Sequence, residues 1–197
     1  MKAPKNMGVS IRERLTQRAR ERRENAQLLM TRYAIERVLY RLSVSPHRDR
    51  FVLKGAMLFS FWAQVPYRAT GDLDLLGFGE SGPEAMAAVF ADILATSVDD
   101  DGLIFRPDTL RVAAAREEDQ YSGVRLDFVA ELAGARLPMH VDVGYGDAIT
   151  PGPVDIEYPS LMGQPAATLK AYPPESFEAS WAAGGTWTGL GEIAISI

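Results

Sequence analysis

A short segment that begins at Gly71 carries two aspartates, Asp72 and Asp74, which alternate with leucines. Such alternation has the period of a β-strand, so both carboxylates point to one face and the leucines to the other. Two like charges about 5 Å apart repel by roughly 3 kcal/mol at an effective dielectric near 20. The pair therefore needs a cation or a basic partner. Mg²⁺ is the natural candidate, because carboxylates and substrate phosphates usually hold this ion together.

Upstream of the aspartates, the order strand, glycine, helix is expected. Residues 51–54 read as a short buried strand, Gly55 follows, and residues 56–62 read as an apolar helix. Backbone amides near Gly55 are then expected at a helix N-terminus, where amides bind phosphate.

Two alternating segments farther along the chain flank residues 133–135 and predict a β-hairpin. The apolar positions of the two strands are Val124, Leu126, Phe128, Ala130 and Leu132 in the first and Leu137, Met139, Val141 and Val143 in the second. On the polar side of the second strand, Asp142 offers a third carboxylate.

Two other polar residues are expected on the same side of the hairpin. Asp127 either lines the cleft or pairs with Arg125 or Arg136. His140 either assists at the site or is an ordinary polar strand residue, and the second interpretation is favoured.

Two stretches of the sequence resemble a known family. Residues 51–77 contain F-V-L-K-G-A-M-L-F and R-A-T-G-D-L-D-L-L-G, and residues 139–147 read M-H-V-D-V-G-Y-G-D. They resemble the AbiEii/AbiGii-type nucleotidyltransferases, toxins of bacterial abortive-infection and toxin–antitoxin systems within the DNA polymerase β-like superfamily. The resemblance implies an α/β fold: a polymerase β-like nucleotidyltransferase domain, with a small mixed sheet flanked by helices and an N-terminal helical segment.

The resemblance also implies an activity and roles for single residues. The activity is Mg²⁺- or Mn²⁺-dependent transfer of NMP from an NTP to a hydroxyl of tRNA or of a protein, and a cognate antitoxin is the expected partner. The implied catalytic and metal-binding residues are Asp72, Asp74 and Asp142. The implied nucleotide-binding residues are Lys54, Gly55, Arg68 and Thr70.

The sequence departs from this family after Glu175. Family members typically continue with an Ala-Glu-Lys helix and an Arg-x-Lys-Asp segment, whereas here no Lys or Arg follows Lys170. A second hypothesis therefore stays open: a catalytically impaired nucleotide-binding or regulatory module that lost the C-terminal catalytic segment.

Basic residues are concentrated at the front of the chain. Residues 1–54 hold 14 Lys or Arg against 5 Asp or Glu, and the remainder holds 7 against 21. A capping box at Ser10 predicts a helix that carries arginines as far as Arg23. These arginines stand at positions 12, 14, 18, 20, 22 and 23. They either contact an RNA backbone or belong to a solvated face with interspersed glutamates, and the second interpretation is favoured.

Length and composition predict one domain without disulfides. We expect an N-terminal helical segment over residues 1–50, a nucleotidyltransferase core over 51–175 and an atypical tail over 176–197. The 197 residues include no cysteine. Membrane insertion is not expected, because no apolar run approaches the ~20 residues that span a bilayer. Without a signal-peptide pattern, the expected location is the cytoplasm.

Overall fold

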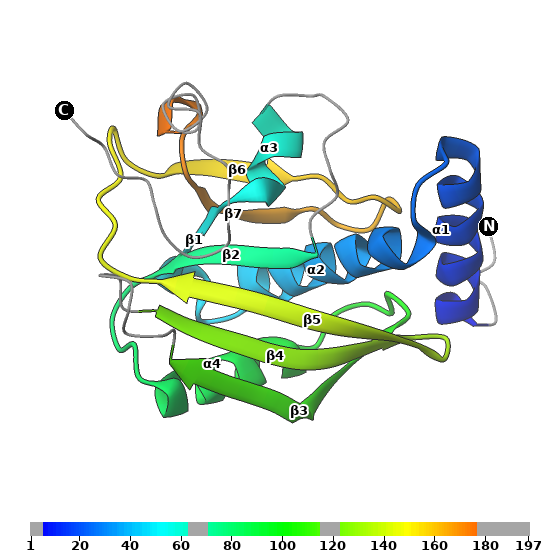
Figure 1. Ribbon diagram of the computed structural model, residues 1–197, viewed down its shortest axis with the longest axis horizontal. Coiled ribbons are helices and arrows are strands. Elements are labelled where there is room, and N and C mark those ends of the chain that lie inside the picture. The colour runs from blue at the N-terminus through cyan, green and yellow to red at the C-terminus, as the bar shows by residue number, and fades with distance from the viewer. Residues whose placement is uncertain (1–5, 63–70, 115–122, 177–197) are drawn as a thin grey trace.

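The computed structural model describes residues 6–62, 71–114 and 123–176 and contains a seven-stranded sheet (Figure 1). The strands are β1 (Phe51–Lys54), β2 (Asp72–Gly77), β3 (Leu103–Ala114), β4 (Gly123–Leu132), β5 (Ala135–Gly144), β6 (Val154–Tyr158) and β7 (Ala167–Ala171). Their order across the sheet is β3-β4-β5-β2-β1-β7-β6. β2 runs parallel to β5 and β1 parallel to β7, and the other neighbours are antiparallel. The predicted fold class, an α/β domain with a mixed sheet, is confirmed.

Helices cover one face of this sheet. The helices are α1 (Met7–Arg22), α2 (Ala26–Val44), α3 (Ala56–Trp62) and α4 (Pro83–Ala95), with a 3₁₀ turn η1 (Arg48–Arg50). In Figure 1, α2 and α4 lie behind the sheet, and α1 stands across its right-hand end. The leucines of β2 and the alternating apolar residues of β4 and β5 are buried. The aspartates between the leucines of β2 therefore face away from this core.

The first helix begins earlier than the sequence predicts. Its N-cap is Asn6, whose side chain accepts a hydrogen bond from the amide of Val9 at 3.1 Å. Ser10 is therefore not the cap, and the expected capping box is wrong. Asn is an equally good N-cap, because its side-chain oxygen satisfies an amide of the first turn.

α1 is part of the core rather than an appendage. Ile11, Leu15 and Ala19 on one side of the helix are buried. At its start Gly8 lies against the backbone of Gly102: a Cβ on Gly8 would stand 2.9 Å from the carbonyl oxygen of that residue. The sequence predicts a helix there but does not indicate which elements it packs against.

The hairpin between β4 and β5 has a two-residue turn. Ala133 and Gly134 both have positive φ angles, 46° and 83°, as a type I′ turn requires. Leu132 then pairs with Ala135, and each residue farther from the turn pairs in step. This register decides which polar residues of the two strands meet.

A buried group of charges ties α2 to the loop that precedes β3. Asp101 is 2% exposed and receives hydrogen bonds from Arg37 at 3.1 Å and from Arg41 at 2.6 Å. Tyr33 donates to the backbone oxygen of Asp101 at 2.7 Å, and Arg37 also donates to the backbone oxygen of Pro165. Each buried charge has a partner of opposite sign, as burial requires.

Among the described residues, none of the helices combines the length and the apolar character needed to cross a membrane.

Replacing Asp101 by Asn should lower the free energy of unfolding by about 3–5 kcal/mol, because Arg37 and Arg41 would keep their buried charges without a counter-ion. Urea denaturation monitored by circular dichroism measures this change. The exposed neighbour Asp99, replaced by Asn, is the matched control. Equal stability of the two variants would show that the buried cluster is not a stability element.

Glu36 supports a second stability prediction, which concerns pH. Its side chain is buried and accepts the amide of Leu161 at 2.8 Å. Burial raises the pKa of Glu36 from 4.5 to about 7, against the opposing effects of that amide and of Arg32. The folded protein therefore holds this proton more tightly than the unfolded chain does.

The stabilising effect of that proton is complete below pH 4.5 and is lost as the pH rises to about 7. Glu36→Gln stays neutral and can still accept the Leu161 amide. Its free energy of unfolding relative to wild type should therefore rise across this window, by about 3 kcal/mol in all, at ~1.4 kcal/mol per pH unit. Urea denaturation at each pH measures it, with exposed Glu24→Gln as control. A flat difference would contradict the prediction.

Candidate active site

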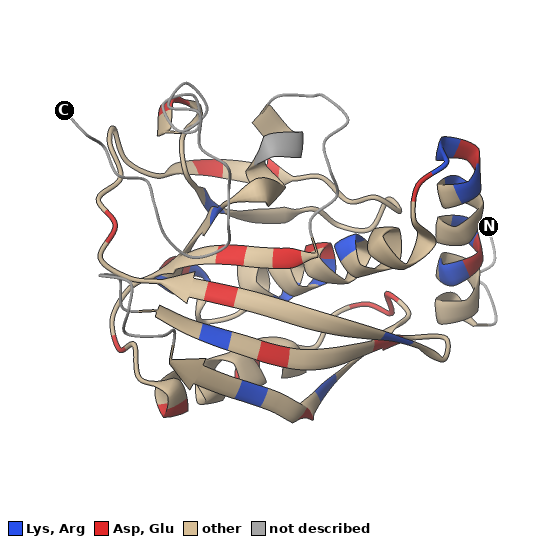
Figure 2. Ribbon diagram, in the orientation of Figure 1, with Lys and Arg blue, Asp and Glu red and all other residues tan. Residues whose placement is uncertain are grey.

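Charged side chains form a row across four neighbouring strands on the face opposite the helices. Asp74 of β2 lies opposite Lys54 of β1 on one side and Asp142 of β5 on the other. Asp142 in turn lies opposite Arg125 of β4. Figure 2 shows this alternation of acidic and basic bands on the front of the sheet. The structure therefore brings together Lys54, Asp74 and Asp142, three of the residues that the sequence assigns to the site.

A second row runs two residues away. Asp72, exposed at the start of β2, lies opposite His140 of β5, and His140 lies opposite Asp127 of β4. Nδ1 of His140 and Oδ1 of Asp127 are 2.5 Å apart. Asp127 thus pairs with the histidine, and the expectation that it would otherwise pair with Arg125 or Arg136 is wrong.

Arg125 instead holds the third carboxylate. Its Nε and Nη2 donate to the two oxygens of Asp142 at 2.8 and 2.7 Å, a bidentate geometry. Asp142 is 3% exposed, whereas 45% of the Arg125 side chain is exposed. The guanidinium group therefore lies over the carboxylate, on the side that faces solvent.

Asp74 is the most perturbed acid of the row. The pKa of Asp74 is raised to about 6, chiefly by burial and then by the negative charges of Asp142 and Asp72, while Lys54 and Arg125 oppose the rise. Carboxylates in this environment gain from a neighbouring cation, which would offset both the desolvation and the repulsion.

Gly55 has a role that the sequence did not indicate. It follows β1 directly and precedes α3, as expected, but its φ is +79° and its Cα lies against the side chain of Asp74. A Cβ at this position would stand 2.2 Å from Oδ2 of Asp74. The glycine therefore makes room for the carboxylate, and phosphate binding by its amide stays a prediction.

Lys54 is held by a residue that the sequence analysis did not single out. Its Nζ donates to Oδ2 of Asp147 at 2.9 Å, and the hydroxyl of Tyr172 donates to the same oxygen at 2.9 Å. Burial and the charge of Asp147 raise the pKa of Tyr172. Asp147 ends the second stretch that resembles the family, which is the only sequence signal for it. Gly144 leaves space for the ammonium group, since a Cβ there would lie 3.0 Å from Nζ.

The donor chemistry of this face suits a hard divalent cation. Four carboxylates (Asp72, Asp74, Asp142 and Asp147) stand against two basic groups, Lys54 and Arg125. This leaves two negative charges in excess, with oxygen ligands of the type that Mg²⁺ and Mn²⁺ prefer. Within the described residues no group of three acidic, histidine or cysteine side chains is already arranged to hold a metal ion. Arg68 and Thr70 lie outside the described residues.

A family profile matches this part of the chain. The profile of the nucleotidyl transferase AbiEii toxins of type IV toxin–antitoxin systems matches residues 37–179. The chain belongs to the AbiEii family. The matched region contains all seven strands and every residue of the two charged rows. It begins within α2, so α1 lies outside it.

One solved structure supports the fold assignment of this AbiEii protein, and a second was also found. A presumed nucleotidyltransferase from H. pylori aligns with a TM-score of 0.50 at 15% identity, over 77% of this chain and 56% of that chain. JHP933 from Helicobacter pylori aligns with a TM-score of 0.45 at 13% identity, over 77% of this chain and 54% of that chain. This chain thus spans a little over half the length of either structure. No curated protein matches the sequence.

Gly55→Ala tests the close packing between Gly55 and Asp74. The control is Gly134→Ala, because Gly134 has a similar φ of +83° but nothing within 4 Å of the added Cβ. Both variants place alanine in the left-handed region, at a cost of about 1–2 kcal/mol. Only Gly55→Ala also displaces a side chain, which should lower its unfolding free energy by a further ~1–3 kcal/mol. Guanidinium denaturation of both variants measures the difference, and equal losses would contradict the packing argument.

Proposed function

We propose that this AbiEii protein is a metal-dependent nucleotidyltransferase that moves NMP from an NTP to a hydroxyl of an RNA, such as tRNA, or of a protein. The observation that supports the proposal most directly is the row formed by Lys54, Asp74 and Asp142, with Asp72 beside it on β2. The row places carboxylates and a lysine side by side, as a site for a metal and a triphosphate needs.

In this proposal Asp72 and Asp74 hold Mg²⁺ or Mn²⁺, with Asp142 as a third carboxylate ligand. The ion would neutralise charge on the triphosphate. Lys54 and the amide of Gly55 bind phosphate oxygens on the side of β1. The acceptor oxygen forms a bond to the α-phosphorus, the bond to pyrophosphate breaks, and Asp142 helps to remove the proton of the acceptor hydroxyl. Positioning and charge neutralisation account for most of the catalysis.

A second candidate function rests on the pairing of the basic groups. Arg125 already binds both oxygens of Asp142, and Lys54 already binds Asp147. A site whose described basic groups are engaged in this way also suits a module that binds a nucleotide and turns it over slowly or not at all. The biological role that we propose for either candidate is that of a toxin in an abortive-infection or toxin–antitoxin system, with a cognate antitoxin as partner.

The assay that separates the two functions uses each α-labelled NTP with Mg²⁺. Transfer of label to total tRNA or to protein supports the transferase. Mg-dependent binding of an NTP without transfer of label supports the binding module, and absence of both binding and transfer contradicts the two candidates together.

Asp74→Asn should weaken Mg-dependent NTP binding roughly tenfold or more, which corresponds to ~1.4 kcal/mol or more. The reason is the loss of one carboxylate ligand. The unfolding free energy should not fall, because neutralising Asp74 removes the repulsion from Asp142 and Asp72. Isothermal titration calorimetry and thermal denaturation measure the two effects. Asp155→Asn, on the exposed edge strand β6, is the matched control. Binding by Asp74→Asn that equals binding by the control would falsify the metal-site assignment.

A further inference from the structure

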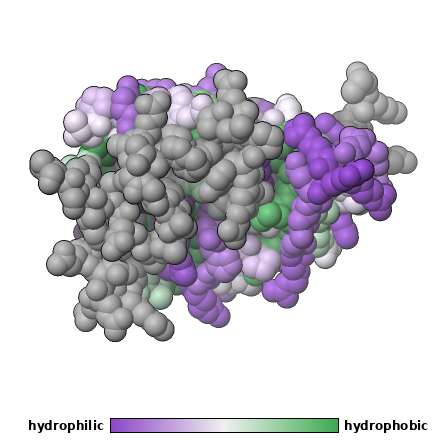
Figure 3. Space-filling model, turned by 45° about the horizontal axis from the view of Figure 1, so that its top comes forward, coloured by the Kyte–Doolittle hydropathy of each residue, from purple (hydrophilic) through white to green (hydrophobic). Residues whose placement is uncertain are grey.

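α1 and its C-cap residue carry six arginines, none of which forms an ion pair with a carboxylate in the part of the chain that the structure describes. Between residues 7 and 23 these six arginines stand against two glutamates. Within the described residues no ion pair involves any of the six, whereas Arg37, Arg41, Arg106 and Arg125 each pair with a carboxylate. Strongly hydrophilic residues gather over α1 at the right-hand end of the molecule (Figure 3). The proposed active site uses none of these groups.

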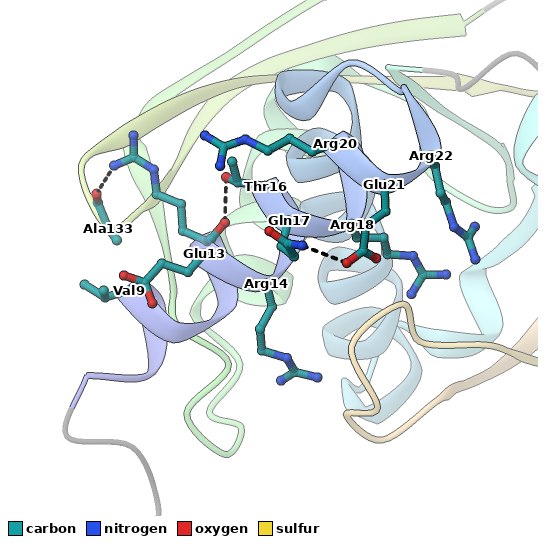
Figure 4. Close-up of a pocket in the computed structure, with 11 residues that line it drawn as sticks. Val9, Glu13, Arg14, Thr16, Gln17, Arg18, Arg20, Glu21, Arg22 and Ala133 are labelled. Carbon is teal, nitrogen blue, oxygen red and sulfur yellow. Dashed lines mark hydrogen bonds between the residues drawn. The ribbon is translucent and has the colours of Figure 1, made fainter.

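The arginines are sorted by the helical repeat. Arg14, Arg18 and Arg22 are four residues apart, so they form one stripe with steps of about 6 Å along the helix. Figure 4 shows these three side chains extending to one side of α1 and Arg20 to another. Glu13 and Glu21 are on a separate ridge, where Glu21 accepts a hydrogen bond from Gln17 at 2.8 Å. Glu21 stands three residues after Arg18 and is therefore a neighbour of the stripe. Three arginines against this one glutamate still leave the path along the stripe with an excess of positive charge.

The structure restrains two guanidinium groups of this stripe. Arg18 donates to the backbone oxygen of Leu161 at 2.9 Å, and Arg14 donates to that of Met162 at 3.4 Å. Carbonyl groups restrain the side chains without neutralising their charge, so donors that stay exposed can attract anions. The charge of Arg18 also interacts with buried Glu36, so Arg14 and Arg22 contribute most of this attraction. The same side chains line an open groove of about 930 Å³. Side chains that are already restrained lose less conformational entropy when a ligand binds than freely moving side chains would.

The stripe leads towards the proposed active site. Arg22 ends α1, and α2 starts four residues later at Ala26. Leu28 in the first turn of α2 lies beside Gly71, since a Cβ on Gly71 would be 3.8 Å from Cδ1 of Leu28. Gly71 directly precedes Asp72. A ligand that lies along the stripe therefore passes close to the start of β2.

Charge favours a polyanion as that ligand. The protein has a net charge of −5, and residues after 54 have an excess of 14 acidic groups. An acidic protein with a cluster of arginines on one helix can attract a polyanion to that helix. Regularly spaced guanidinium groups suit phosphodiesters, which they bind in bidentate fashion.

We propose that the Arg14–Arg18–Arg22 stripe of α1 is the docking surface for the phosphate backbone of an RNA strand whose hydroxyl is presented to the carboxylate row. The proposal rests on the proposed nucleotidyl transfer and selects RNA, rather than protein, as the acceptor. α1 then acts as a substrate-positioning element outside the region that matches the family profile.

The test measures binding without catalysis. Fluorescence anisotropy with labelled tRNA, in EDTA and without NTP, gives the affinity at several salt concentrations. Arg14→Gln combined with Arg22→Gln removes two phosphate contacts, so the slope of log affinity against log salt should fall by about 1.4–1.8. The affinity at low salt should fall at least roughly tenfold.

Two control variants isolate the cause. Arg48→Gln combined with Lys170→Gln removes the same charge near the opposite end of β2, where both side chains pair with exposed aspartates. This control should leave the slope unchanged. Arg14→Lys combined with Arg22→Lys keeps the charge and should largely restore the slope, which separates lost charge from disturbed packing. If the Gln pair and the control lose RNA affinity equally, the stripe is not the docking surface. Binding of poly-L-glutamate with no binding of RNA would also overturn the proposal, in favour of an acidic protein partner.

Transfer assays separate this proposal from the proposed function. If wild type transfers nucleotide to RNA and the Gln pair raises KM for RNA with little change in kcat, both stand. If wild type transfers nucleotide but the Gln pair leaves both KM and the salt slope unchanged, only the docking surface fails. If wild type binds RNA through the stripe without transferring nucleotide to any acceptor, the docking surface stands as an RNA-binding site and the transferase proposal fails.

Discussion

The parallel pairing of β2 with β5 is the constraint on which the site depends. It places Asp74 directly beside Asp142, two acids that would repel each other at this distance. Lys54 and Arg125 at the two ends of the row offset that repulsion. The row is thus balanced only while both basic groups stay in place, and the extra carboxylates at positions 72 and 147 make the whole face acidic. The pairing of β2 with β5 therefore gathers carboxylates on one face of the sheet, and their negative charge favours a divalent cation there.

Part of this arrangement could be read from the sequence. Alternation around Asp72 and Asp74 correctly predicts that both point away from the core. The hairpin register could also have been derived from the sequence. A two-residue Ala-Gly turn pairs residue 132 with 135, and counting back along both strands pairs Arg125 with Asp142. The sequence interpretation derived no register from the turn, and it left open whether Asp127 lines the cleft or pairs with Arg125 or Arg136. The register depends on Ala133, whose positive φ allows a two-residue turn, and alanine gives no sequence signal of such a conformation.

Other features depend on contacts between distant segments, which periodicity does not encode. Nothing in the sequence says that β2 pairs with β5 in parallel, that Asp147 returns to Lys54, or that Gly55 packs against Asp74. Gly55 was assigned to phosphate because backbone amides at a helix N-terminus bind phosphate. The absence of a side chain on a glycine can equally make room for a carboxylate. Only the position of the neighbouring strand distinguishes the two uses.

The division of charge along the chain has a physical consequence for any reaction at this face. Nucleotides and RNA are both polyanions, so an acidic sheet repels them unless a cation offsets its charge. In the proposed reaction the RNA acceptor does not bring such a cation with it. In the proposed function, the arginines of α1 lie apart from the carboxylate row, so they would attract the RNA without neutralising the aspartates assigned to the metal. Placing the arginines within the row would instead pair them with those aspartates, as Arg125 is paired with Asp142. In this proposal, the separation of the arginines from the carboxylate row is what would let one domain bind a cation and a polyanion at the same time.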